Sequence, residues 1–544
     1  MNESDSILSS VLNMTTLKLA GCKLGTFPAF LRHQSKLSDL DLSDNQIQGS
    51  IPSWIWKLES LTYLNLSHNF LTDFERPLQD LSSSLTLLDL HDNQIHGQIP
   101  FLPRRAVYLD YSANRFSSVV IPANTGDYPA YTIFLSLSNN SFHGHIPTFF
   151  CNFSSLQVLD LSLNNFSGSI PSCLMAMTET LAILNLRKNG LRGVIPDEFP
   201  TLCALRTLDL NGNQLDGPMP KSLVNCVKVE VLDLGINRIV DGFPCSLKNI
   251  STLRVLVLRQ NNFHGSIGCP NTNDIWKTLQ IADLASNNFT GVLPGKSFTT
   301  WEGMMPDEAQ TLQYEITINV YYQDTVSISS KGRRVQWVKI LTFFTAIDFS
   351  CNHLVGKIPE EMMNFEALYI LNLLNNALTG QIPSSIGNLR KLESLDLSNN
   401  SLTGEIPAQM ADLNFLSSLN LSYNHLDGRI PTGTQIQSFE AYSFIGNHGL
   451  CGPPLTTNCS INEKPGTSRT SHSENSINWN FISVEVGFVF GIGIVLLPLF
   501  FWNPWRTWYW QHIDDLLYRV FPQLNFRYEC RGGKYYRTLR WQSH

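Results

Sequence analysis

An asparagine that returns at nearly constant spacing is the feature that most constrains this chain of 544 residues. It closes the pattern Leu-x-x-Leu-x-Leu-x-x-Asn, as in Leu37, Leu40, Leu42 and Asn45. Apart from one gap, the intervals run from 21 to 26 residues. A unit of about 24 residues cannot bury its own apolar side chains, so such units must stack into a solenoid with a shared core. The position is filled by Cys22, Asn45, Asn69, Asn93, Asn114, Asn140, Asn164, Asn189, Asn213, Asn237, Asn261, Asn287, Asn352, Asn376, Asn400 and Asn424.

Each repeat has a simple physical reading. The Leu-x-Leu segment is expected to form a short strand with both leucines pointing inward. The asparagine side chain is expected to bond to backbone groups of adjoining coils, where a sharp bend would otherwise leave buried amides unpaired. The pattern therefore predicts an α/β solenoid of leucine-rich repeats, with parallel strands on the concave face and their x positions pointing out from it.

The one gap, from Asn287 to Asn352, holds an insertion at 295–343 that lacks the leucine pattern. A long unpatterned insertion in a compact array is usually functional or disordered, and its aromatic content argues against full disorder. One interpretation is that the insertion binds a ligand. The alternative is that it only packs against the solenoid and does not contact a ligand. The candidate ligand residues of this insertion are Tyr321, Tyr322, Lys331, Arg333 and Arg334.

Eleven cysteines leave at least one without a partner in the chain. Cys245 and Cys269 each lie eight residues after their repeat asparagine, one coil apart, so we expect a disulfide across coils. Cys451 and Cys459 are close enough to form a small disulfide loop after the last repeat. Cys530 is expected to be reduced in the tail. Four other cysteines do not clearly occupy matching positions in successive coils: Cys151, Cys173, Cys203 and Cys226.

Residues 481–502 form an apolar run that contains one charged residue, Glu485. As a helix it would be roughly 33 Å long, enough for a hydrocarbon core of ~30 Å. Basic residues are concentrated after the run, which predicts that 503–544 are cytoplasmic. The sequence therefore predicts one transmembrane helix and a large outer domain, with a buried soluble helix as the alternative.

The strand positions that face outward become basic in the middle repeats. The residue after the second strand leucine is mostly Ser in the early repeats, and is Arg at Arg187 and Arg259. A basic stripe on an acidic outer domain could hold an acidic or glycan-bearing ligand, and the alternative is a solvated face without a ligand. The candidate contacts are Arg187, Lys188, Arg206, Arg254 and Arg259.

Four residues after most repeat asparagines comes a glycine, often followed by x-Ile-Pro, as at Gly168. This variant resembles the plant class of extracellular leucine-rich repeats. With the gap, four repeats after it, the Asn447–Cys459 ending and one span, the chain resembles a plant leucine-rich-repeat receptor-like protein of the Verticillium-wilt-resistance type. The resemblance implies a ragged start at 1–11, repeats at 12–294, an island at 295–343, four repeats at 344–435, a cap at 436–459, a linker at 460–480, a transmembrane helix at 481–502 and a cytoplasmic tail at 503–544.

The resemblance also implies partners and a location. In the family the island helps to hold ligand, a Cys451–Cys459 pair closes the cap, and the last repeats contact a co-receptor kinase. A Gly-x-x-x-Gly motif at Gly487 and Gly491 would pair with the span of an adaptor receptor kinase. We therefore expect a plasma-membrane, single-pass, kinase-less receptor for an extracellular protein, peptide or glycan, acting in plant defence. Family members begin with a signal peptide and a cap, so we also expect this chain to be truncated at its N-terminus.

Other classes of function are not supported. A net charge of −7 argues against a nucleic-acid binder, and signatures of an enzyme, a cofactor site or a metal site are not found. The open alternatives are a developmental peptide receptor, a soluble inhibitor of wall enzymes and a truncated paralogue that does not signal. Asn-x-Ser/Thr glycosylation sites are consistent with export but partly follow from the repeat consensus: Asn13, Asn65, Asn139, Asn152, Asn165, Asn249, Asn288, Asn399, Asn420 and Asn458.

Overall fold

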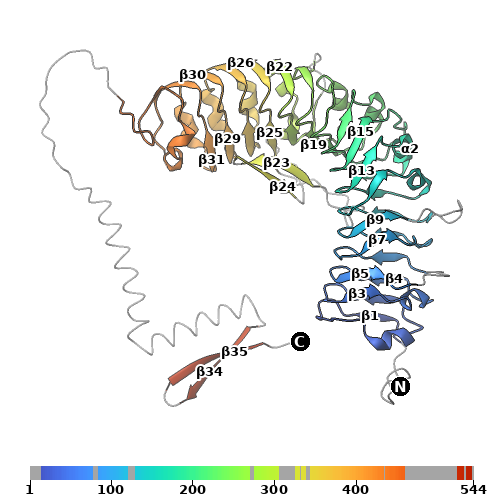
Figure 1. Cartoon of the computed structure of the whole chain (residues 1–544). Helices are drawn as coiled ribbons and strands as arrows, with labels where there is room; N and C mark the ends of the chain where they lie inside the picture. Colours follow the sequence, from blue (N-terminus) through green and yellow to red (C-terminus); the bar gives the residue numbers. More distant parts are fainter. Residues whose placement is uncertain are drawn as a thin grey trace, which may run out of the picture. The chain divides into compact units, whose positions relative to one another are not determined.

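The computed structural model describes residues 14–76, 84–119, 129–269, 275–305, 325–330, 332–337, 344–433, 435–459, 524–531 and 534–541. The chain divides into two units, 1–460 and 461–544. The first unit is a curved stack of coils (Figure 1). In the second unit the described part is an antiparallel hairpin of β34 (Leu524–Arg531) and β35 (Lys534–Trp541).

A parallel sheet of 16 strands lines the inner side of the curved unit (Figure 1). One of its strands precedes each of the sixteen repeat positions predicted from the sequence. The predicted solenoid with parallel strands on its concave face is therefore confirmed. The strands are β1 (Thr16–Lys18), β2 (Asp39–Asp41), β4 (Tyr63–Asn65), β6 (Leu87–Asp89), β8 (Tyr108–Asp110), β10 (Phe134–Ser136), β12 (Val158–Asp160), β14 (Ile183–Asn185), β16 (Thr207–Asp209), β18 (Val231–Asp233), β19 (Val255–Val257), β21 (Ile281–Asp283), β25 (Ala346–Asp348), β27 (Ile370–Asn372), β29 (Ser394–Asp396) and β31 (Ser418–Asn420).

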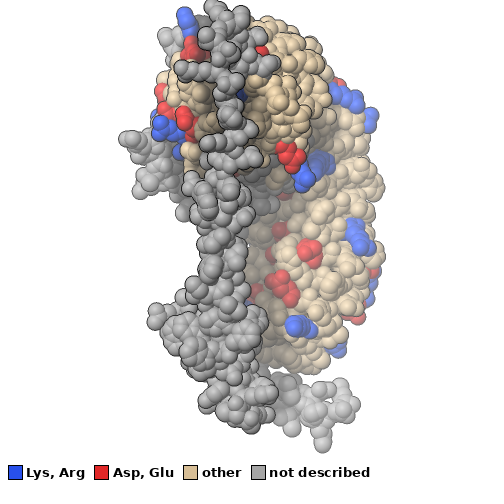
Figure 2. Space-filling view, turned by 90° about the vertical axis from the view of Figure 1, so that its left-hand side faces the viewer, with Lys and Arg blue, Asp and Glu red and all other residues tan. Residues whose placement is uncertain are grey.

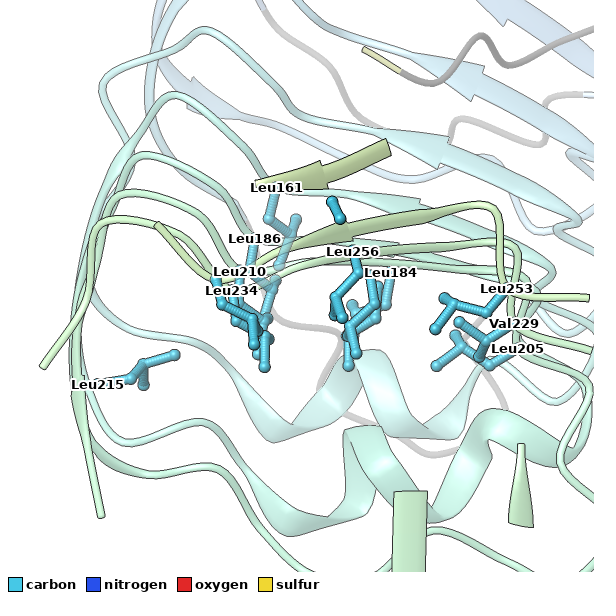
Figure 3. Packing of buried hydrophobic residues seen from close by; sticks show 14 of the residues in the cluster. Leu161, Leu184, Leu186, Leu205, Leu210, Leu215, Val229, Leu234, Leu253 and Leu256 are labelled. Carbon is cyan, nitrogen blue, oxygen red and sulfur yellow. The ribbon is translucent and has the colours of Figure 1, made fainter. Parts of the chain in front are cut away.

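The core is a set of leucine columns that run from coil to coil. Leu186, Leu210 and Leu234 lie one above another, and Leu205, Val229 and Leu253 form a second column (Figure 3). All six are essentially buried. Each coil contributes only a slice of this core, so its stability depends on the neighbouring coils.

The repeat asparagines bond to the backbone of two coils, as predicted. In Asn213, Nδ2 donates to the carbonyl oxygens of Leu210 in its own coil and Leu186 in the preceding coil, each at 3.0 Å. Its Oδ1 accepts the N–H of Leu191, also in the preceding coil, at 3.1 Å. Asn447 makes the same bonds to Leu421, Phe444 and Leu426, so the ladder continues one step into the cap.

In most coils the residues that follow the repeat asparagine, up to about the glycine of Gly-x-Ile-Pro, form a short strand along a second edge of the coils. The repeat glycine has a positive φ, 82° at Gly193, which an L side chain rarely adopts. These strands pair in parallel in small sheets. They are β3 (Gln48–Ile51), β5 (Phe70–Phe74), β7 (His96–Ile99), β9 (Arg115–Val119), β11 (His143–His145), β13 (Asn165–Gly168), β15 (Gly190–Val194), β17 (Gln214–Asp216), β20 (His264–Ser266), β22 (Asn288–Val292), β26 (His353–Gly356), β28 (Ala377–Gly380), β30 (Ser401–Glu405), β32 (His425–Arg429) and β33 (Gly449–Cys451).

The helical segments of the coils are short, and most are 3₁₀ turns. A proline commonly precedes the turn, and its ring fixes the φ of this entry residue. They are η1 (Ala29–His33), η2 (Ile55–Lys57), η4 (Thr148–Asn152), α2 (Ser172–Ala176), η5 (Met177–Glu179), η6 (Lys221–Asn225), η7 (Cys245–Asn249), α3 (Gly295–Phe298), η8 (Glu302–Met304), η9 (Glu360–Asn364), η10 (Ser384–Asn388), η11 (Ala408–Asp412), η12 (Ile436–Ser438) and η13 (Ala441–Ser443).

Disulfides join neighbouring coils in the middle of the stack. The structure contains the Cys245–Cys269 pair and, in the cap, the Cys451–Cys459 pair that the sequence analysis expected. It also pairs the four cysteines whose positions did not match from coil to coil, because the two members of each pair lie at different distances from their repeat asparagines. These pairs are Cys151–Cys173 and Cys203–Cys226.

The insertion does not interrupt the solenoid. Strand β21 pairs directly with β25, and Asn352 donates to the carbonyl oxygen of Leu284 across the insertion. The first part of the insertion belongs to the core, since Trp301 is 1% exposed and packs against Phe298. A later part forms an antiparallel hairpin of β23 (Val326–Ser330) and β24 (Arg333–Trp337) on the inner side of the arc (Figure 1).

No helix among the described residues is long and apolar enough to span a membrane. The predicted transmembrane helix, 481–502, and its Gly487 and Gly491 lie outside the described residues.

Candidate ligand-binding face

The concave face is built from the residues on either side of each central strand leucine. In β16, Leu208 is buried in the core, while Thr207 and Asp209 point to the other side of the strand. Because the strands pair in parallel register, equivalent residues of neighbouring strands face the same side: Thr207 lies beside Val231, and Asp209 lies beside Asp233. The face therefore consists of columns that run across the coils.

One column is made of carboxylates and amides. Each of its aspartates accepts a backbone N–H two residues later, as Asp209 Oδ1 does from Asn211 at 3.0 Å. This column was not predicted from the sequence, although an Asp between the two strand leucines was a visible signal. Its members include Asp41, Asn65, Asp89, Asp110, Asp160, Asn185, Asp209, Asp233, Asp283, Asp348, Asn372, Asp396 and Asn420.

Burial and mutual repulsion change the protonation of this column. Burial, followed by the charge of Asp89, raises the pKa of Asp110 to about 6. Burial, followed by the charge of Asp348, raises the pKa of Asp283 to about 7, despite the nearby Arg259. Stacked carboxyl groups favour protons or basic partners because ionising all of them would place like charges close together.

Two arginines of the predicted basic stripe, Arg187 and Arg259, are such partners. Arg259 Nη1 lies 2.8 Å from Asp283 Oδ2 and 3.8 Å from Asp348 Oδ2. Its side chain is 13% exposed, and that of Arg187, whose Nε lies 3.9 Å from Asp209 Oδ2, is 7% exposed. A Cβ at Gly235 would lie 2.7 Å from Asn211 Nδ2 and 3.2 Å from Arg259 Cγ, so glycine leaves room for both side chains. Arg187 and Arg259 therefore offer little surface to a ligand.

The other predicted basic residues of the sheet are more accessible. Lys188 is exposed, next to Asn189 of the asparagine ladder. Arg206 Nε lies 3.1 Å from Glu230 Oε1, and its side chain is 32% exposed. Arg254 donates to Gln280 Oε1 at 2.8 and 3.0 Å. On the face visible in Figure 2, charges of both signs are interspersed on a mostly uncharged surface.

The island hairpin contacts the middle of this face. Arg187 Nη1 donates to Thr325 Oγ1 at 2.6 Å, although the two residues are 138 positions apart in sequence. Ile328 of β23 is buried in an apolar cluster with outward-facing side chains of the sheet, including Val231, Val255 and Ile281. The insertion therefore covers part of the sheet and uses one of the predicted stripe arginines as an anchor.

The predicted island residues are only partly described. Arg333 is exposed on β24, and Arg334 follows it on the same strand. Tyr321, Tyr322 and Lys331 lie outside the described residues.

A second apolar cluster occupies the outward positions nearer the first coils. It contains Phe134, Val158 and Ile183, and Tyr108 stacks on Phe134 with ring centroids 4.3 Å apart. The sequence pattern placed these residues on the outward face, but their apolar character was not recognised.

The predicted glycosylation sites fall into two groups. Asn65 and Asn420 belong to the concave column, and each accepts a hydrogen bond from the serine of its own Asn-x-Ser triplet. Asn13 lies outside the described residues. The remaining sites have exposed asparagines: Asn139, Asn152, Asn165, Asn249, Asn288, Asn399 and Asn458.

Comparison with known proteins agrees with this architecture. The leucine rich repeat family model matches residues 13–71, 35–95, 179–239 and 366–426, and a second model of that description matches 132–153 and 155–177. Receptor-like protein 35 of Arabidopsis thaliana is 41% identical over 511 residues, which are 90% of this chain and 49% of that protein. The chain spans 32 to 60% of the length of the curated relatives it matches.

Two solved structures have the same fold. The ectodomain of the Arabidopsis thaliana membrane receptor kinase GASSHO1/SCHENGEN3, in complex with CASPARIAN STRIP INTEGRITY FACTOR 2, matches 80% of this chain and 47% of that chain. Its TM-score is 0.65 at 31% identity. The Arabidopsis receptor kinase HAESA ectodomain, in complex with an IDA peptide hormone ligand, matches 83% of this chain and 72% of that chain, with a TM-score of 0.60 at 27% identity. This chain belongs to the plant leucine-rich-repeat receptor-like proteins.

Proposed function

We propose that this chain is a kinase-less cell-surface receptor that binds an extracellular ligand on its concave face. The observation that carries the proposal is the contact of the island with the sheet through Arg187 and Thr325. This contact creates a boundary between the part of the concave face that the island covers and the more open first coils. One structural neighbour, the HAESA ectodomain, is bound to a peptide hormone, which supports a peptide over a glycan or a larger protein as the first ligand to test.

The ligand contacts would lie along this boundary. Lys188, Arg206 and Arg254 provide accessible cationic or hydrogen-bonding groups on the sheet. From the island, Arg333 and Arg334 are proposed as contacts, with Tyr321, Tyr322 and Lys331 carried over from the sequence analysis. Acidic groups on the ligand would complement these side chains.

A crosslinking experiment tests the ligand site. A photoreactive residue at Arg333 should capture a ligand from extracellular plant extracts, whereas one at Leu202, an exposed position 80% accessible in another coil, should not. Equal capture at the two positions, or capture at neither, would contradict binding at the island.

Signalling would use the membrane and a partner kinase. In this function residues 481–502 would span the plasma membrane, with Gly487 and Gly491 packed against the span of an adaptor receptor kinase. The four repeats after the island would contact a co-receptor kinase, and the resemblance favours a role in plant defence. Full-length chain purified from plant membranes should bring a kinase with it, and the absence of any kinase with and without elicitor would refute signalling.

Three alternatives remain distinguishable by experiment. A developmental peptide receptor would have the same architecture, so a ligand screen separates the two roles. A soluble inhibitor of wall enzymes would be released from membranes by carbonate, whereas a spanning receptor would stay. A truncated paralogue that does not signal would bind no kinase, and transcript sequencing upstream of the Met1 codon addresses it directly.

A further inference from the structure

Two histidines of adjacent coils face each other on the concave side of the first coils. His68 follows β4 and His91 follows β6. Their rings are nearly perpendicular, with centroids 4.4 Å apart, and the two Nε2 atoms are separated by 2.9 Å. His91 occupies the position that is serine in neighbouring coils, at Ser67 and Ser112.

The opposite nitrogen of each ring lies on a carboxylate. His68 Nδ1 is 2.6 Å from Asp92 Oδ2, and His91 Nδ1 is 2.7 Å from Asp89 Oδ1. An ionised carboxylate can only accept, so each Nδ1 must carry the hydrogen. In a neutral ring this leaves a lone pair on Nε2. Two such lone pairs would point at each other across 2.9 Å, so the arrangement requires a cation between them, either a proton or a metal ion.

The surroundings favour a cation and leave a path to it. Asp89, Asp92 and Asp110 all act on His91 through their negative charge. The atoms of Asp89, His91 and Asp110 that could ligate a metal ion, a carboxylate oxygen or a ring nitrogen from each residue, lie within 4.8 Å of one another. The side chains of His68 and His91 are 44% and 31% exposed, so an ion can enter from solvent.

We propose that His68 and His91 bind a divalent transition-metal ion of the zinc and copper class through their Nε2 atoms. Imidazole nitrogen is a preferred ligand for these ions. Two metal–nitrogen bonds of tetrahedral geometry separate the nitrogens by about 3.3 Å, so the rings would have to part by only a few tenths of an ångström. Asp89 and Asp92 orient the rings from behind, as carboxylates do in many zinc–histidine sites. The site is independent of the receptor function proposed above.

The test uses the full chain, purified in detergent, stripped of metal and titrated with Zn²⁺. Calorimetry and elemental analysis should give a specific site whose affinity falls by about tenfold or more in His68→Gln and in His91→Gln. His96→Gln is the matched control, because His96 is exposed on the neighbouring β7 and should not change this affinity. With Cu²⁺, electron paramagnetic resonance should show two coupled nitrogens in the wild type and one in each variant.

A measurement on the wild-type chain keeps the test valid if a variant fails to fold. Zn²⁺ should protect His68 and His91, but not His96, from modification by diethyl pyrocarbonate. Failure to bind Zn²⁺ or Cu²⁺ stoichiometrically would refute the proposal. Binding that survives His68→Gln but is lost in Asp110→Asn would also refute it, because the ion would then sit among Asp89, His91 and Asp110.

Discussion

The first coils and the middle coils share one repeat but use their concave positions differently. In the first coils the position after the second strand leucine carries small or half-exposed polar groups, such as Ser43, Ser67 and His91. In the middle coils it carries Arg187 and Arg259, which are buried against aspartates. The difference shows that a repeat position can be a surface site in one coil and part of a buried ion network in another.

The two regions also differ on the outer side of the coils. Three disulfides, Cys151–Cys173, Cys203–Cys226 and Cys245–Cys269, join neighbouring middle coils. Within the described part of the first coils, 14–76 and 84–119, there is no disulfide. The coils that hold the island are thus crosslinked on one side and ion-paired on the other.

Removing the buried guanidinium of Arg259 should have the largest effect on the stability of the fold. Arg259→Met leaves Asp283 and Asp348 buried side by side, and breaking a buried pair costs about 3–5 kcal/mol. Hydrogen exchange should accelerate most in the coils around β21 and β25. Arg115→Met, at an exposed arginine of β9, should change little. Equal effects of the two substitutions would remove the contrast between the regions.

Removing a disulfide should destabilise the middle coils selectively. The Cys203–Cys226 bond closes a loop of 23 residues, for which the chain-entropy model gives about 3 kcal/mol. The double substitution to serine should lower the resistance of these coils to denaturant and protease. Cys22→Ser, at an exposed free cysteine in the first coils, is the control. Unchanged protection in the double variant would show that stacking alone holds this region.

Stability should fall as pH rises, over different windows in the two regions. A raised carboxyl pKa means that the folded chain keeps a proton that the unfolded chain has lost, so unfolding becomes easier as pH rises. The stability contributed by Asp110 should be lost between about pH 4 and about pH 6, and that contributed by Asp283 between about pH 4 and about pH 7. Each unit of pKa difference corresponds to about 1.4 kcal/mol at most.

Substitution to asparagine checks these windows. Asp110→Asn should weaken the pH dependence of the first coils, and Asp283→Asn that of the middle coils, as followed by hydrogen exchange at several pH values. A stability that rises between pH 4 and 7, or one unaffected by both substitutions, would contradict the assignment.

Releasing the island should have the smallest effect on stability. Thr325→Val removes the acceptor for Arg187 Nη1, which is worth about 1–2 kcal/mol locally. Hydrogen exchange in 326–337 should accelerate while the first coils are unchanged. Thr379→Val, at an exposed threonine of β28, serves as the control. If the hairpin remains equally protected, the packing of its Ile328 against the sheet valines is sufficient to hold it.

Much of the scaffold was predictable because its causes are local and repeated. Sixteen strands, the asparagine bonds and the Cys245–Cys269 pair follow from residues that recur at one phase. Cys151–Cys173 and Cys203–Cys226 were not predicted, because the two cysteines of each pair lie at different distances from their repeat asparagines. The positions of the aspartate column could have been predicted from the Leu-Asp-Leu triplets. The burial of these aspartates and their raised pKa values depend on how closely the coils stack.

The repeat period by itself determined the fold of the first unit, since each coil meets only its neighbours and every neighbour obeys the same pattern. Only the tertiary structure decided what the outward positions do. The contact between Arg187 and Thr325 joins residues 138 positions apart, and the His68–His91 pair depends on side-chain directions in two coils. A period records which residues share a column, but not which of them a distant segment or a neighbouring charge will engage.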